Sequence, residues 1–145
     1  MVEFKYYNAN PMDNETNDCV IRAIMTYNYG EVNNLELNKI YYNNIYMTLS
    51  RYGMKKFLMI NDEKNYMEFL KDMGLKEYKC YKNVNVDDLD RFFVQGDMII
   101  NLKGHLTCMR DWCIYDTFDC RNELVESVFV LEKKESKVRK TFRWL

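Results

Sequence analysis

Three side chains in this sequence have the types that thiol-based acyl transfer requires. Cys19 follows Asn17 and Asp18 and begins an apolar run with helical spacing, so its sulfur is expected at a helix N-terminus. His105 is the one histidine of the chain, and Asp116 follows it on the next predicted strand. A thiolate attacks a carbonyl carbon, an imidazole moves the proton, and a carboxylate orients the imidazole. The three residues therefore predict the nucleophile, the base and the orienting group of one site.

Each of the three residues also has a purely structural interpretation. A cysteine in an apolar helix is often a small buried side chain, a strand histidine is often only hydrogen-bonded in place, and an aspartate often caps a turn. The chemical interpretation needs a lowered pKa for the thiol of Cys19. A helix N-terminus and a neighbouring imidazolium both stabilise a thiolate, and this sequence offers both.

The periodicity of apolar residues predicts the elements that must position this site. A helix begins at Cys19 and ends at Gly30, with Asn17 or Asp18 as its N-cap. The remaining pattern predicts helices over about 33–52 (Leu35, Ile45 and Leu49 inward), from Asn61 to the stop at Gly74, and over 86–93, and strands over 97–102, 105–110, 113–117 and 125–131. Helices followed by strands indicate one α+β domain over residues 1–145, with N-terminal helices packed on a C-terminal antiparallel sheet.

The hairpin of the two middle strands tests whether His105 and Asp116 are able to meet. A two-residue turn at Asp111 and Trp112 places Thr107 opposite Asp116, and because opposed residues share a face, His105 and Asp116 lie on the same face. A four-residue turn preserves this arrangement, whereas a three-residue turn separates the pair. The same alternation places Cys108 and Cys113 on the opposite face.

Composition limits the classes of function. The net charge of −1 argues against binding nucleic acid, although residues 133–145 form a basic tail that we expect to be a solvated end or last strand. We find neither a signal peptide nor an apolar run long enough to span a membrane, which predicts a cytoplasmic protein, in the host cytoplasm if a phage encodes it. Five cysteines without a Cys-x-x-Cys pair suggest neither a disulfide framework nor a zinc site, and no cofactor or metal is expected.

Three segments together resemble a known family: 17–24 (NDCVIRAI), 104–107 (GHLT) and 114–120 (IYDTFDC). They are similar to small papain-like cysteine peptidase domains of phages and bacteria, whereas residues 30–95 match only in their helical layout. The resemblance implies a papain-like fold of the NlpC/P60 or C39 kind. It also implies that Cys19 is the nucleophile, His105 the base and Asp116 the orienting residue.

One position departs from the family pattern. Such peptidases place a glutamine that stabilises the oxyanion about six residues before the cysteine, and here that position is Asp13. An ionised carboxylate donates no hydrogen bond. Asn14 and Asn17 are nearby amide donors, the backbone N–H of Cys19 is another, and we select Asn17 as the oxyanion candidate although it also suits the helix cap.

The function expected from these residues is hydrolysis of a peptide, isopeptide or amide bond in a protein or peptide substrate, through a thioester at Cys19. The same triad serves acyltransferases, because an amine can replace water in the second step. The alternative is a phage-type protein that binds a host protein target, as a defence inhibitor does, using the same fold without catalysis.

Overall fold

The computed structural model describes residues 1–12 and 17–131, so the basic tail 133–145 lies outside the described residues. The described chain runs through β1 (Glu3–Tyr6), α1 (Cys19–Tyr29), α2 (Leu35–Met54), α3 (Glu63–Asp72), β2 (Leu75–Lys79), the 3-10 helix η1 (Val86–Arg91), β3 (Met98–Leu102), β4 (His105–Arg110), β5 (Cys113–Asp116) and β6 (Val125–Leu131). The α+β class is confirmed.

The strands form one six-stranded sheet in the order β1-β5-β4-β3-β6-β2, and this sheet is mixed. Strand β1 runs parallel to β5, with Glu3 opposite Cys113 and Tyr6 opposite Asp116, and the other neighbours are antiparallel. The predicted antiparallel sheet is therefore wrong at one edge. Both unpredicted strands, β1 and β2, are short edge strands that lack a continuous apolar run, so their sequences carry little strand signal.

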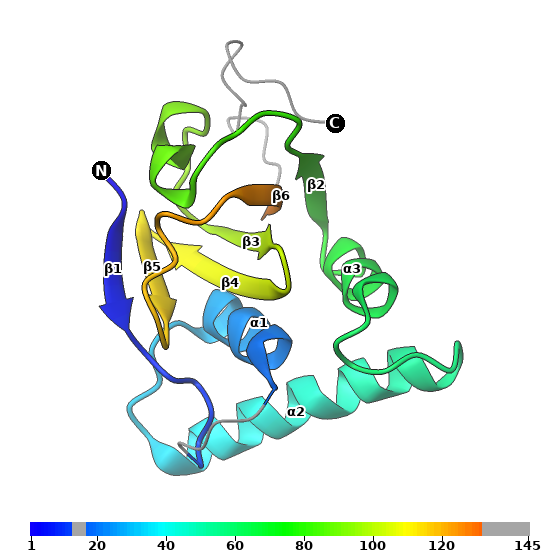
Figure 1. The fold of residues 1–145 in the computed structure, drawn as a ribbon. Coiled ribbons are helices and arrows are strands. Elements are labelled where there is room, and N and C mark those ends of the chain that lie inside the picture. Colours follow the sequence, from blue (N-terminus) through cyan, green and yellow to red (C-terminus); the bar gives the residue numbers. More distant parts are fainter. Residues whose placement is uncertain (13–16, 132–145) are drawn as a thin grey trace.

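Helix α1 covers one face of the sheet and lies against β4 (Figure 1). Its buried residues Val20, Ile24 and Met25 pack in one cluster with Leu106 and Cys108 of β4. This apolar stripe explains why the segment is helical and why it lies on the sheet. The helix ends at Gly30, whose φ of 68° suits glycine, and its first residue is Cys19.

Helices α2 and α3 extend this layer beyond α1 (Figure 1). Ile45 and Leu49 of α2 are buried as expected, but Leu35 is 55% exposed, which corrects its predicted inward position. Leu35 is the first residue of the helix, where the chain has not yet reached the core. Within α3, the apolar residues Tyr66, Phe69 and Leu70 are buried.

The β4–β5 hairpin has the predicted register. Arg110 lies opposite Cys113, and both turn residues, Asp111 and Trp112, have positive φ values of 49° and 62°. Positive φ at both central positions is the pattern of the type I′ turn, whose twist matches that of the flanking strands. The turn thereby fixes which β5 side chains lie on the same face as His105.

No helix in the described parts of the chain, 1–12 and 17–131, is long and apolar enough to cross a membrane.

Candidate active site

The imidazole of His105 is held by the carboxylate of Asp116. The distance from His105 Nε2 to Asp116 Oδ2 is 2.7 Å, and the two side chains are only 15% and 4% exposed. The ring of Phe118 lies beside that of His105, with the two centroids 4.7 Å apart and the planes tilted by 48°. The predicted meeting of these two residues is thus present in the structure, and the imidazole has a defined orientation.

The Sγ of Cys19 is hydrogen-bonded to the side chain of His105 and to the backbone N–H of Leu106. Because Asp116 occupies Nε2, the nitrogen left for Cys19 is Nδ1. Burial by itself raises the pKa of the Cys19 thiol, but the two hydrogen bonds and the charges of His105 and Arg22 outweigh burial. The pKa of the Cys19 thiol is consequently below its ordinary value, which increases the thiolate fraction relative to a free cysteine.

The two partners reach each other where a helix and a strand begin. Cys19 is the first residue of α1, and His105 is the first residue of β4. Leu106 of β4 packs against α1, so alternation along the strand places the side chain of His105 on the opposite face of β4. Because both residues stand at the start of their elements, the thiol and the imidazole meet at the end of the strand.

Asp116 is the most heavily bonded carboxylate of the site. Its Oδ2 accepts hydrogen bonds from His105 and from Thr107 Oγ1 at 2.6 Å. Its Oδ1 accepts the backbone N–H of Thr117 at 2.7 Å and Arg22 Nη1 at 3.2 Å. Burial raises the pKa of Asp116, but the hydrogen bond and charge of His105, with the Thr107 and Thr117 bonds, leave it below its ordinary value. Asp116 is therefore an ionised acceptor with a fixed plane.

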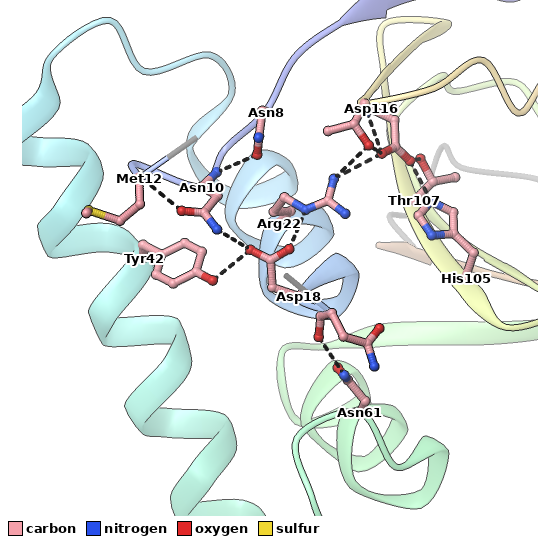
Figure 2. A network of polar contacts seen from close by, with 12 residues as sticks. Asn8, Asn10, Met12, Asp18, Arg22, Tyr42, Asn61, His105, Thr107 and Asp116 are labelled. Atoms are coloured by element: carbon pink, nitrogen blue, oxygen red, sulfur yellow. Dashed lines mark hydrogen bonds and ion pairs between the residues drawn. The ribbon is translucent and has the colours of Figure 1, made fainter. Parts of the chain in front are cut away.

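Asp18 and Arg22 connect the start of α1 to this carboxylate (Figure 2). Asp18 occupies the N-cap position, as predicted, but its side chain makes no capping hydrogen bond. It accepts instead from Arg22 Nε at 2.8 Å, Tyr42 Oη at 2.7 Å and Asn10 Nδ2 at 2.9 Å. Sequence reasoning missed Arg22, although its i,i+4 spacing from Asp18 predicts an ion pair on one helix face.

The oxyanion candidate Asn17 is exposed, and its backbone carbonyl accepts a hydrogen bond from Asn61 Nδ2 at 2.7 Å. Asn61 lies just before α3, so this bond ties the residue preceding Asp18 to the α2–α3 connection. The other residues weighed for the oxyanion, Asp13 and Asn14, lie outside the described residues. Asn17 therefore remains a prediction for this role.

The other four cysteines differ from Cys19 in their electrostatics. Burial raises the pKa of the thiols of Cys80, Cys108 and Cys113, and it raises that of Cys120 to about 12. Cys108 and Cys120 are buried, whereas Cys80 and Cys113 are partly exposed. The cysteine that sequence reasoning selected is therefore the one whose surroundings favour the thiolate. Within 1–12 and 17–131, no group of three or more His, Cys, Asp or Glu side chains is arranged to hold a metal ion.

His105 should make the stability of the protein depend on pH. Burial lowers its pKa, but hydrogen bonds and charges of Asp116 and Cys19 raise the pKa to about 9, from 6.5 for a free histidine. A raised folded pKa adds stability that is complete below about pH 6.5 and is lost as the pH rises through about 9. The lowered pKa of Cys19 changes the stability with pH in the opposite direction. The test therefore uses the Cys19→Ala background, in which Asp116 still raises the pKa of His105. Between pH 6 and pH 9, the free energy of unfolding of Cys19→Ala, measured in urea, should fall by roughly 1–3 kcal/mol. This fall should be absent in Cys19→Ala/His105→Gln.

Comparison of the chain with protein-family models, with curated proteins and with solved structures gives no match.

Proposed function

We propose that the protein is a papain-like cysteine hydrolase that cleaves a peptide, isopeptide or amide bond. One observation carries the proposal: the same imidazole bonds Cys19 on one side and Asp116 on the other. This is the geometric relation between nucleophile, base and orienting residue that acyl transfer requires. Cys19 is the nucleophile, His105 the general base and acid, and Asp116 the orienting residue.

The reaction would proceed in two halves through a thioester. The Cys19 thiolate attacks the carbonyl carbon, and the C=O electron pair moves onto oxygen. When this intermediate collapses, the C–N bond breaks and the leaving amine takes a proton from the His105 imidazolium. In the second half, neutral His105 accepts a proton from water as the water oxygen attacks the thioester. The acid is then released and the Cys19 thiolate is restored.

The start of α1 supports this sequence of steps. The charged oxygen of the intermediate would develop near the N-terminus of α1, where the backbone N–H of Cys19 and the amide of Asn17 are the candidate donors. An amine in place of water would give acyl transfer with the same residues, so a transferase remains a variant of this proposal.

The direct test is acylation of purified protein with p-nitrophenyl acetate, followed by intact-mass and peptide mass spectrometry. We expect a burst of p-nitrophenol, an acetyl thioester on Cys19 that hydroxylamine removes, and no burst in Cys19→Ala. The partly exposed Cys80 and Cys113 are internal controls, since burial raises the pKa of both thiols. Acetylation of Cys19 no faster than that of these two cysteines would contradict the proposal.

The second candidate is a protein that binds a partner without catalysis. Leu37, Ile40, Met47 and Met54 of α2 follow helical spacing along one face and are 42%, 52%, 50% and 73% exposed. An exposed apolar stripe of this kind is typical of helices that contact another protein. The exchange Met47→Glu would test the stripe by sedimentation velocity, first for self-association. Concentration-dependent association lost in Met47→Glu, together with an unreactive Cys19, would favour this role.

A further inference from the structure

We infer that Arg22 is a positioning residue of the site, a bridge that fixes the carboxylate of Asp116 to the start of the helix carrying Cys19. The inference rests on the proposed function and adds a residue that acts through the triad. Arg22 Nε bonds Asp18 Oδ1 at 2.8 Å, and Arg22 Nη1 bonds Asp116 Oδ1 at 3.2 Å. Figure 2 shows the guanidinium between the two carboxylates.

The burial of this arrangement separates it from ordinary surface ion pairs. The side chain of Arg22 is 14% exposed, and those of Asp18 and Asp116 are 7% and 4% exposed. Removing a guanidinium from water is costly unless most of its donors are paired in good geometry. The planar guanidinium reaches Asp18 through Nε and Asp116 through Nη1, whereas a lysine ammonium carries all its donors on one nitrogen. The bridge is therefore specific to arginine.

The effect on Asp116 is to fix the rotation of its carboxylate. Arg22 and the backbone N–H of Thr117 both bond Oδ1, so Oδ2 is left to face His105 and Thr107. Without Arg22, the Oδ1 side keeps only the Thr117 backbone bond and a distant hydroxyl at 3.5 Å. Rotation of the carboxylate would then weaken the bond that orients the imidazole.

The effect on Cys19 comes through Asp18, its neighbour in the chain. Asp18 is held from three directions, by Arg22 within α1, by Tyr42 of α2 and by Asn10 of the N-terminal segment. The helix start is thus fixed to the same guanidinium that fixes Asp116. Arg22 couples the position of the nucleophile to the position of the residue that orients its base.

The charged and titratable groups that interact with the Cys19 thiol come from three elements. They are Arg22 on α1, Tyr66 on α3 and His105 on β4. Of these, Arg22 is the fixed cation, and loss of its charge should raise the pKa of the Cys19 thiol. Loss of the bridge should also weaken the His105–Asp116 bond, a change that charge alone does not explain.

The test compares Arg22→Gln and Arg22→Lys with a matched control, Arg110→Gln. Arg110 is also partly buried and bonds the backbone carbonyl of Thr26 at 3.4 Å, away from the triad. Two quantities are measured: the rate of iodoacetamide labelling of Cys19 against pH, and the 15N spectrum of the imidazole. Because the chain has one histidine, every imidazole signal belongs to His105.

We expect Arg22→Gln to slow labelling at pH 7 by about fivefold to tenfold, to raise the pH midpoint, and to broaden or shift the Nε2 signal. Arg22→Lys should keep part of the rate but show the same Nε2 change, and Arg110→Gln should match wild type. Arg22→Lys also carries the test if Arg22→Gln fails to fold.

Two outcomes would overturn the inference. One is a wild-type Nε2 signal and a labelling rate within twofold of wild type in Arg22→Gln. The other is complete restoration by Arg22→Lys, because charge without a bridge would then be sufficient. Failure of the proposed function is a different result, namely slow labelling of Cys19 in the wild-type protein itself.

Discussion

His105→Gln is expected to slow the alkylation of Cys19 at neutral pH by roughly tenfold and to raise its pH midpoint. The variant removes the hydrogen bond and the positive charge that keep the pKa of the thiol low, while burial, which raises it, remains. The resulting rise in the pKa of the thiol reduces the thiolate fraction, and the greater nucleophilicity of a more basic thiolate recovers only part of this loss. For hydrolysis, loss of the general acid and base should cost about 10²–10⁴-fold.

The rate of iodoacetamide labelling against pH, followed by peptide mass spectrometry, measures this effect. Cys113→Ser is the matched control. Cys113 is partly exposed, and it lies opposite Arg110 at the turn of the hairpin rather than beside a residue of the triad. Its labelling at Cys19 should equal that of wild type. An unchanged midpoint in His105→Gln would show that the imidazole does not activate the thiol, and the hydrolase proposal would fail with it.

Asp116→Ala is expected to lower the free energy of unfolding by about 3–5 kcal/mol. The carboxylate is 4% exposed and accepts hydrogen bonds from His105, Thr107, Thr117 and Arg22. Its removal leaves a buried guanidinium with one carboxylate partner and leaves several donors unpaired, which is far costlier than losing a surface pair. Removing one partner from a buried charge pair has effects of this size.

Urea denaturation at pH 7 measures the loss, and Asp119→Ala is its control. Asp119 lies three residues further along and bonds Arg121 at 2.8 Å, but its side chain is 43% exposed. Its removal should cost no more than about 1 kcal/mol. Similar losses in the two variants would mean that the network around Asp116 contributes no more than an exposed ion pair.

Much of the geometry of the candidate site is predictable from the sequence because the hairpin is local. The turn at Asp111 and Trp112 sets the register of β4 and β5 by itself, and alternation then puts His105 and Asp116 on one face. The start of α1 at Cys19 is predictable for a similar reason, since its apolar spacing and the polar residues before it are contiguous. The contact between the start of α1 and the hairpin is long-range, and only the chemical roles of Cys19 and His105 suggested it.

The rest was not predictable because it depends on contacts between distant segments. Strand β1 is four residues long, and its parallel pairing with β5 spans more than a hundred residues, so no local pattern signals it. Asn17 or Asp18 was expected to cap α1, but the side chain of Asp18, which occupies the N-cap position, binds tertiary partners from α2 and the N-terminal segment instead. Capping preferences describe an isolated helix end, and a buried guanidinium and a phenol compete with the backbone N–H groups for the carboxylate.

The order of these parts along the chain has a consequence for synthesis on the ribosome. Cys19 is made before His105 and Asp116, which lie 86 and 97 residues further along the chain. At 5–20 residues per second, the nascent thiol waits about 5–20 s for its imidazole. During this time the thiol lacks the hydrogen bond and the charge of His105 that lower its pKa, and it gains them only after the hairpin has emerged and docked against α1.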